Sequence, residues 1–404
     1  MAYTKAITLL DGAMGTMLQK AGLKLGDRPE TLSITAADVV EGIQRQYVQA
    51  GTRLLLANTF CANAHKLAGT GFEVEDVVRA SVAVAKRACV GTDAKVLLDV
   101  GPIGELLEPL GTLKFDEAYA LYAQMIRAGA AVGAEGVFFE TFSDLNELRA
   151  GVLAAKECSD LPVFASMTFE ASGRTFLGCR ADAAAMALDA LGVERIRFMT
   201  SHPKDLSDDL IDAMAQCKHV CNHLHLPVQS GNDDILRLMN RRYTREDYLR
   251  KVEKLRAAVP GIGLTTDLIV SFPGETEKQF EDTCSLVREV GYDAAFTFIY
   301  SPREGTRAAA MEGRIPEAES TRRIEQLIRE VEASTARVHQ SMIGRHENVL
   351  VESLSKRDDR KVSGKGTRGI TVTLDGTEAD IGTIIPVTIT SAAVNTLRGE
   401  RTER

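Results

Sequence analysis

The chain has 404 residues, of which 45% are apolar and 26% are charged, and its formal net charge is −8. This content is enough for a large barrel or for two to three domains with their own cores, which excludes a disordered chain. No stretch reaches the roughly 20 apolar residues of a membrane helix, which favours a soluble cytoplasmic protein without a membrane partner. The acidic balance argues against nucleic-acid binding by the whole surface, although it leaves room for a local basic site.

Nine short apolar runs, each followed by a polar or glycine-containing tip and then a helical pattern, predict parallel β/α construction. Nearly continuous hydrophobicity is typical of strands buried on both faces. We expect a hybrid TIM-like (β/α) barrel of eight to nine parallel strands, with the last strand displaced; two incomplete half-barrels are the alternative. The runs cover residues 7–10, 53–57, 95–100, 136–139, 163–167, 195–199, 223–228, 263–270 and 294–300.

Polar or glycine residues stand at the ends of these runs, where a β/α barrel carries its chemistry. Each has a simpler interpretation: Asp11 with Gly12 suits a turn, and Glu140 or Asp144 suits the N-terminus of a helix. The repetition along the chain favours a site. The run ends are Asp11, Asn58, Gly101, Glu140, Thr168, His202, Gln229, Gly274 with Glu275, and Ser301.

After Ser301 the pattern changes twice. Residues 316–345 carry apolar side chains on one helical face and predict a linker helix. Residues 346–404 consist of short β-runs separated by turns and predict a small β-barrel. Residues 356–368 hold six Lys/Arg against two Asp, which suits a solvated loop or an RNA-contacting loop with the candidates Lys356, Arg357, Lys361, Lys365 and Arg368.

Seven cysteines lie scattered along the chain, so free thiols or metal ligands are expected rather than a disulfide framework. His223 and His225 alternate along one strand and share a face. With Cys61 and Cys179 they are the candidates for a mixed Cys/His zinc site. In the alternative interpretation they are core residues, the cysteines being small buried hydrophobes.

The first half of the chain contains six ordered motifs, among them Asp11-Gly-Ala-Met-Gly-Thr16, Gly101-Pro-Ile-Gly104 and Glu140-Thr-Phe-Ser-Asp144. Through them residues 1–193 resemble the homocysteine-binding S-methyltransferase family, which includes the N-terminal module of cobalamin-dependent methionine synthase. The resemblance implies a β/α barrel. It also implies a homocysteine-like pocket formed by Asp11, Asn58, Glu140 and Asp144.

The second half contains a different set of motifs, among them His223-Leu-His-Leu-Pro-Val-Gln-Ser-Gly231, Phe272-Pro-Gly-Glu-Thr276 and Phe298-Ile-Tyr-Ser-Pro-Arg303. Residues 194–400 resemble the C-terminal half of the radical-SAM tRNA methylthiotransferases, especially the 2-methylthio-N6-isopentenyladenosine synthases, which end in an RNA-binding TRAM domain. The resemblance implies tRNA as a partner. It also implies an S-adenosylmethionine site that includes Gln229, Ser230, Gly274 and Glu275.

The metal ligands of both families are missing from the sequence. The first family holds zinc with three thiolates, two of them adjacent in sequence, and this chain has no adjacent cysteines. The second holds a [4Fe–4S] cluster with a Cys-x3-Cys-x2-Cys run, and here Leu224 stands where Cys217 and Cys221 would need a third cysteine. Without zinc a homocysteine thiol stays mostly protonated at neutral pH.

Three functions remain. The first is a tRNA-modifying methylthiotransferase-like protein fused to a homocysteine S-methyltransferase-like domain. The second is a homocysteine S-methyltransferase, and the third is a non-catalytic tRNA-binding fusion protein. The expected segments are 1–193, 194–315, 316–345 and 346–404.

Overall fold

The computed structural model describes residues 9–24, 26–199, 202–355 and 358–402. The chain divides into two compact units, unit 1 with residues 1–191 and unit 2 with residues 192–404. The expected change of sequence character at residue 193 lies two positions from this division. In the described part of the chain, no helix is long and apolar enough to cross a membrane.

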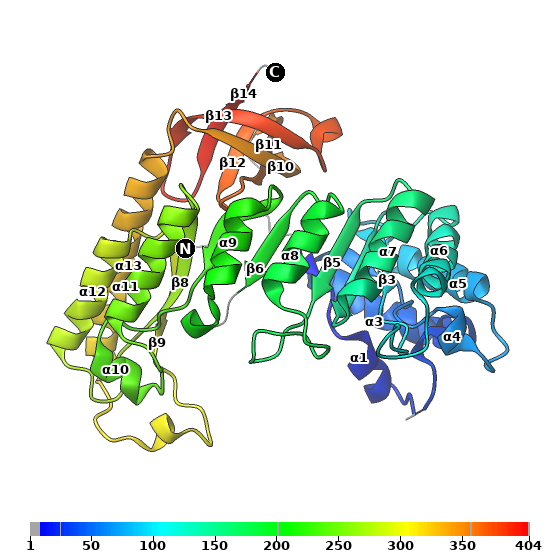
Figure 1. Cartoon of the computed structure of the whole chain (residues 1–404), viewed down its shortest axis with the longest axis horizontal. Coiled ribbons are helices and arrows are strands. Elements are labelled where there is room, and N and C mark those ends of the chain that lie inside the picture. The colour runs from blue at the N-terminus through cyan, green and yellow to red at the C-terminus, as the bar shows by residue number, and fades with distance from the viewer. Residues whose placement is uncertain (1–8, 25, 200–201, 356–357, 403–404) are drawn as a thin grey trace. The chain divides into compact units, whose positions relative to one another are not determined.

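Unit 1 contains a five-stranded parallel sheet in the order β1-β2-β3-β4-β5, shown in blue to green in Figure 1. The strand order follows the chain, as expected for repeated β/α units. The strands are β1 (Leu9–Leu10), β2 (Thr52–Leu56), β3 (Lys95–Val100), β4 (Val137–Phe142) and β5 (Val163–Met167).

The helices of unit 1 cover this sheet with apolar and small residues. Tyr122 meets Phe139 of β4 edge to face, with ring centroids 5.9 Å apart. Gly151 allows its helix to approach the same ring, because a Cβ there would lie 2.5 Å from Phe139. The helices are α1 (Met14–Lys20), η1 (Pro29–Thr31), α2 (Leu32–Thr35), α3 (Ala37–Ala50), α4 (Ala64–Leu67), α5 (Val74–Cys89), α6 (Phe115–Ala131), α7 (Leu145–Cys158) and α8 (Ala181–Ala190).

Unit 2 begins with a four-stranded parallel sheet in the order β6-β7-β8-β9. In β8 fully buried Leu264 and Leu268 alternate with half-buried Thr265 and Asp267, so one face is apolar and the other carries polar side chains. The strands are β6 (Ile196–Met199), β7 (Val220–His225), β8 (Gly263–Val270) and β9 (Ala294–Ile299).

The helices of unit 2 follow its strands and then continue into one long helix, α13 (Glu317–Gln340). This helix corresponds to the expected segment 316–345. The preceding helices are η2 (Pro203–Asp205), α9 (Asp208–Gln216), α10 (Asp233–Leu238), α11 (Arg245–Ala258), α12 (Glu277–Val290) and η3 (Arg307–Ala310).

The prediction of parallel β/α construction is confirmed, but the expectation of one hybrid barrel is not met by the strand pairing. Among the described residues the nine strands form two sheets, and no pairing joins β5 to β6. The sheet edges keep large apolar side chains in solvent: Phe164 of β5 is 40% exposed, and Phe296 of β9 is 58% exposed. A closed barrel has no edge strands and fills its interior with such side chains. The pairing therefore agrees with the alternative of two partial barrels.

The predicted small β-barrel is confirmed. It is a closed antiparallel and parallel arrangement in the order β10-β11-β12-β14-β13, shown in orange to red in Figure 1. Its core is formed by aliphatic side chains such as Val351, Val372, Val387 and Leu397. The elements are β10 (His346–Ser355), β11 (Asp358–Lys365), β12 (Thr371–Asp375), η4 (Glu378–Asp380), β13 (Ile384–Ala392) and β14 (Leu397–Arg401).

Candidate functional site

Unit 1 brings three carboxyl groups of its sheet into one electrostatic cluster. Asp11 directly follows β1, Asp99 lies in β3 and Glu140 lies in β4. Burial, with a smaller contribution from the charge of Glu140, raises the pKa of Asp11 to about 7. The pKa of Asp99 lies well above its usual range, because the group is buried and because Glu140 and Asp11 carry the same charge. Asp11 and Glu140 were predicted together, and the structure brings them together.

Asp99 was not predicted from the sequence. The one feature of the sequence that could have indicated it is a carboxylate near the end of the otherwise apolar run at residues 95–100. Glu30 was also missed; it is 3% exposed and its Oε1 accepts a hydrogen bond of 2.9 Å from the Cys61 N–H. Within the described residues, Asp11 Oδ1, Asp99 Oδ1 and Glu30 Oε2 have no hydrogen-bond partner. Buried carboxyl oxygens without partners favour a cationic or hydrogen-bond-donating ligand.

Asn58 and Asp144, the other two predicted pocket residues, have structural partners. The Asn58 side-chain amide donates to the Pro29 carbonyl at 2.7 Å and to the Ser33 hydroxyl at 3.2 Å. The Asp144 carboxylate accepts from the backbone N–H groups of Asn146 and Glu147, so it is the N-cap of α7. This role agrees with the simpler interpretation of the sequence, in which Asp144 is an acid at the N-terminus of a helix.

The pKa is raised for both candidate cysteine ligands, Cys61 and Cys179. Burial, followed by the charge of Glu30, raises the pKa of Cys61 to about 11. Burial also raises the pKa of Cys179, whose Sγ donates to the Arg180 carbonyl at 3.4 Å. Zinc needs thiolates or neutral imidazoles. In the described ranges no group of three or more His, Cys, Asp or Glu residues is placed to hold a metal ion, so these donors do not fit the zinc of the first family.

His223 and His225 of β7 share one partner on the neighbouring strand. The Thr265 hydroxyl lies 3.1 Å from His223 Nε2 and 3.0 Å from His225 Nδ1. Burial, followed by the positive charge of Arg197, lowers the pKa of His223 to about 4. The His225 ring lies 3.6 Å from Asp267 Oδ1 and meets Phe296 edge to face. The Thr265 hydroxyl therefore joins the two imidazoles.

Gln229 and Ser230 are buried in the turn that follows β7. Gln229 has a φ of 72°, and its backbone pairs with β8 through Asp267 and Ile269. The hydroxyls of Ser230 and Thr283 lie 3.3 Å apart, and Thr283 also accepts from the Gly231 N–H at 2.9 Å. These contacts fix the turn against α12.

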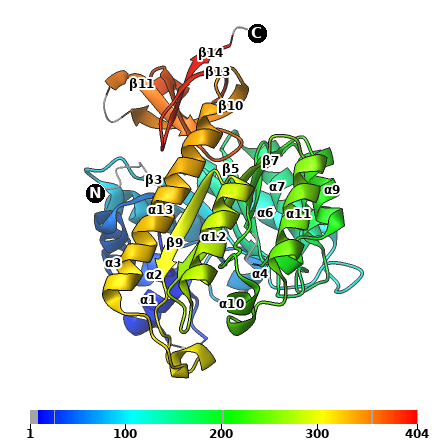
Figure 2. The ribbon, with the colours of Figure 1, turned by 90° about the vertical axis from the view of Figure 1, so that its left-hand side faces the viewer.

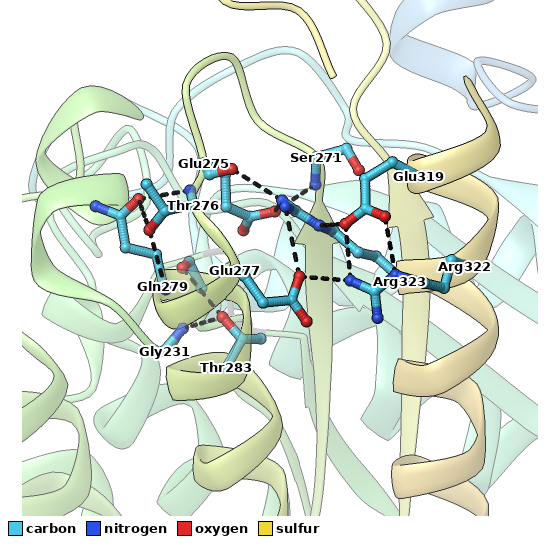
Figure 3. A network of polar contacts seen from close by, with 11 residues as sticks. Gly231, Ser271, Glu275, Thr276, Glu277, Gln279, Thr283, Glu319, Arg322 and Arg323 are labelled. Atoms are coloured by element: carbon cyan, nitrogen blue, oxygen red, sulfur yellow. Dashed lines mark hydrogen bonds and ion pairs between the residues drawn. The ribbon is translucent and has the colours of Figure 1, made fainter. Parts of the chain in front are cut away.

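The tip of β8 is tied to α13 by a network of charged side chains that Figure 3 shows. Glu275 Oε2 accepts from the Ser271 N–H at 2.7 Å and pairs with the Arg323 guanidinium at 3.0 Å. The two side chains are 0% and 6% exposed, so this ion pair is fully desolvated. Burial raises the pKa of Glu275, and the bonds from Ser271 and Arg323 counteract that rise. On its outer side Arg323 also pairs with Glu319 at 2.7 Å.

The remaining atoms of the β8 tip are less satisfied. Gly274 has a φ of 80°, and its N–H donates to the Gly313 carbonyl at 2.8 Å. Ser271, directly before this tip, has a φ of 61° and a buried hydroxyl. The Ser271 hydroxyl, Glu275 Oε1 and the Tyr300 hydroxyl have no hydrogen-bond partner in the described part of the chain.

The predicted RNA-binding residues divide into three groups. Lys361 pairs with the exposed Asp375 at 2.5 Å, and Lys365 Nζ donates to the Thr371 hydroxyl at 2.8 Å. Arg368 is only 8% exposed and forms a two-point ion pair with Asp293, at 2.8 and 2.6 Å. The Arg368 guanidinium is therefore held by Asp293 and does not face solvent as an RNA contact would. Lys356 and Arg357 lie outside the described residues.

The β-barrel is fixed to the sheet of unit 2 at several points. Besides Arg368, the Arg195 guanidinium donates to the carbonyls of Lys365 at 2.9 Å and Asn348 at 2.6 Å. Helix α13 runs from the sheet to the barrel, as Figure 2 shows, and its His339 Nδ1 lies 3.0 Å from the Ala393 carbonyl.

The parallel β/α sheets, the strand-end carboxylates and the closed C-terminal barrel define an α/β protein of TIM-like construction with an appended small β-barrel domain. The chain belongs to the homocysteine S-methyltransferase family, whose sequence model matches residues 8–258. The TRAM domain model matches residues 340–401.

The second half of the chain has close relatives of another kind. It is 50% identical over 209 residues to a tRNA-2-methylthio-N(6)-dimethylallyladenosine synthase of Clostridium novyi (strain NT), covering 52% of this chain and 46% of that protein. The corresponding synthase of Alkaliphilus oremlandii (strain OhILAs) is also 50% identical, with 52% and 44% covered. The chain thus spans about half the length of the curated relatives that it matches.

Among solved structures, the metallated homocysteine methyltransferase MmuM from Escherichia coli is similar. It is 16% identical, with a TM-score of 0.42, and the match covers 76% of this chain and 96% of that one.

Proposed function

We propose that this chain is a tRNA-binding protein related to the tRNA methylthiotransferases, and that its unit 1 holds a homocysteine-like amino acid. The observation that carries the proposal is the complete TRAM barrel, which is closed, has its own core and is fixed to the sheet of unit 2 by the Arg368–Asp293 ion pair. The named activity of the relatives in Clostridium and Alkaliphilus supports tRNA as the partner. The change of family near residue 193 and the segments 194–315, 316–345 and 346–404 are part of this proposal.

Binding of tRNA tests this directly. The Kd of full-length protein for tRNA is measured by fluorescence anisotropy over a range of salt concentrations. The variant Lys361→Ala/Lys365→Ala should bind about tenfold more weakly, because two phosphate-contacting charges are lost. The control is Lys20→Ala/Arg127→Ala, which removes the same charge from exposed positions in unit 1. Wild-type protein that binds tRNA no better than the salt-dependent background would contradict the proposal.

The chain's cysteines do not fit the [4Fe–4S] cluster of the radical-SAM family. When bound, that cluster supplies the electron that cleaves S-adenosylmethionine. Cys221 is 3% exposed, Leu224 occupies the third ligand position and is fully buried, and no third sulfur stands beside them in the described residues. We therefore derive no radical step. Anaerobic reconstitution with iron and sulfide should give no stable visible absorbance, whereas a cluster-bearing protein would contradict this.

S-adenosylmethionine remains a proposed ligand of the β8 tip, held by Gln229, Ser230, Gly274 and Glu275. The proposal is supported by the three buried polar atoms there without a partner, which a polar ligand would satisfy. Isothermal titration with S-adenosylmethionine tests it, with Ser271→Gly as the informative variant. We expect tighter binding by Ser271→Gly, because the change removes a side chain beside the ligand; no heat for either protein would refute the site.

The second candidate function, a homocysteine S-methyltransferase, is favoured by the carboxyl cluster of Asp11, Asp99 and Glu140. These groups suit the α-ammonium of an amino acid. Zinc, when bound in this family, lowers the pKa of the substrate thiol. Since Cys61 and Cys179 do not fit zinc, we expect the amino acid to bind without activation of its sulfur.

Two ligands separate binding from activation. Homocysteine and 2-aminobutyrate, which lacks the thiol, should bind with Kd values within about threefold of each other, and Asp11→Asn should weaken both by about tenfold. A homocysteine affinity that rises more than tenfold on addition of zinc would instead support the methyltransferase. A cytoplasmic location also stays a prediction, supported by the seven cysteines, which are all free.

A further inference from the structure

A surface hollow of about 420 Å³ lies in unit 2, and its lining includes none of the residues discussed above as cofactor or substrate contacts. It is bounded by η2, by the beginning of α9 and by α11. Its floor contains the ring of Tyr243, which is 8% exposed and whose hydroxyl donates inward to the Val228 carbonyl at 3.0 Å. The His202 ring meets Tyr243 edge to face at 5.2 Å.

The rim of this hollow is basic. Five cationic side chains line it against two carboxylates, and Asp205 and Glu246 pair with two of these cations from beside the hollow, which leaves a local charge of +1 on a chain whose total charge is −8. Such a reversal of sign on an acidic chain indicates a site for an anion. The charged lining residues are Lys204, Arg242, Arg250, Lys251, Lys254, Asp208 and Asp247.

Internal ion pairs account for only part of this charge. Lys254 pairs with Asp208 at 2.5 Å, and Arg250 pairs with Asp247 at 3.3 Å and with Glu246 at 3.5 Å. Lys204 lies 3.9 Å from Asp205. Lys251 Nζ donates to the Leu206 carbonyl at 2.7 Å, so its charge is not neutralised by that bond. Arg242 is exposed, and no hydrogen bond or ion pair joins its guanidinium to another described residue.

The pKa values of two neighbouring groups are shifted by nearby positive charges. The pKa of His202 is lowered by burial and then by the charge of Arg241, an effect that Asp205 opposes and Lys204 reinforces. The pKa of Asp208 is lowered by its bond to Lys254 and by the charge of Lys251. These effects agree with the geometry of the hollow.

The shape of the site decides the class of anion. The side chains of Lys204, Arg250 and Lys254 are 52%, 66% and 50% exposed, so they project along a shallow surface rather than enclose a small molecule. A small-molecule phosphate site generally buries most of its ligand. Long, exposed cations around an aromatic floor suit an extended sugar-phosphate backbone.

We propose that this basic hollow binds phosphate groups of an RNA backbone, as a second contact besides the TRAM barrel. This inference rests on the proposed tRNA-binding function and extends it to a second surface of unit 2. Each phosphate contact contributes through release of counterions, so the contribution depends strongly on salt.

The test uses the full chain and the variant Lys204→Ala/Arg242→Ala. We expect the Kd for tRNA to rise about tenfold at low salt, and the slope of log Kd against log salt concentration to fall by about 1.5. The control Lys20→Ala/Arg127→Ala should leave both quantities unchanged. An unchanged thermal midpoint establishes that the pocket variant is folded.

Three other outcomes would overturn the inference. If the pocket variant binds tRNA like the wild type while Lys361→Ala/Lys365→Ala is impaired, the hollow is not an RNA site and the proposed function stands. If the wild type itself fails to bind tRNA, both are refuted. If the pocket variant loses only its affinity for polyglutamate, the hollow is instead a site for an acidic peptide.

Discussion

The carboxyl groups at the strand ends of the two units stand in opposite situations. In unit 1, partly buried Asp11 and buried Asp99 lie near Glu140, and neither forms an ion pair within the described residues. In unit 2, Glu275 is equally buried but is paired with Arg323. A buried carboxyl group that the protein itself neutralises contributes to the fold, whereas one left without a cation is free to recognise a ligand. Family motifs alone do not separate these two roles.

The largest expected effect comes from breaking the compensated pair. Arg323→Met should reduce the free energy of unfolding by about 3–5 kcal/mol, because it leaves Glu275 buried without its cation. Urea unfolding of full-length protein measures the loss. The matched control is Arg322→Met, an exposed arginine of the same network, for which we expect a loss of less than about 1 kcal/mol. Equal losses for the two variants would show that burial does not distinguish them.

Removing the charge of Asp11, the uncompensated carboxyl group in unit 1, should stabilise the protein instead. Because the native pKa of Asp11, about 7, exceeds the unfolded value of 3.8, the native state keeps the proton longer. The stabilisation is therefore present below pH 3.8 and is lost as pH rises through 7. Asp11→Asn should become more stable than the wild type across this window, by about 2 kcal/mol at pH 8. A stability difference that does not change with pH would contradict the assignment.

The pH dependence of stability tests the environment of His223 on the polar face of the second sheet. Its native pKa of about 4 lies below the unfolded value of 6.5, so the unfolded state takes up the proton first as the pH falls. The free energy of unfolding should therefore decrease by about 1–2 kcal/mol between pH 7 and pH 5. In His223→Gln this part of the pH dependence should disappear. A His223→Gln variant with the full acid sensitivity would place the titrating group elsewhere.

The smallest effect concerns Asp144, which the family resemblance places in the substrate pocket and the structure places at a helix N-cap. Asp144→Ala should cost about 1 kcal/mol of stability, and Asp144→Ser should restore most of it. Neither change should alter the Kd for homocysteine. A loss of homocysteine affinity in the stable Asp144→Ser variant would return Asp144 to the pocket.

The sequence predicted the positions of strands and helices better than it predicted which strands pair and which side chains contact each other. Strand positions follow from apolar runs, because burial on both faces leaves a continuous local pattern, as in β3. The split between β5 and β6 depends on pairing between distant segments, which no local pattern encodes. The burial of Arg368 was not predictable for the same reason, since Asp293 lies 75 residues away in the chain. Asp99 was missed because it lies inside the apolar run at residues 95–100, whereas the site candidates were the residues that follow the runs.

Helix α13 has a mechanical consequence. Its 24 residues form a rod of about 36 Å, clamped at one end by Arg323 and joined at the other to the barrel through His339. A domain on a flexible tether explores a volume set by the length of its linker. A domain on a rigid helix keeps one distance and one orientation. RNA bound by the barrel would therefore lie at a fixed position relative to the rest of unit 2.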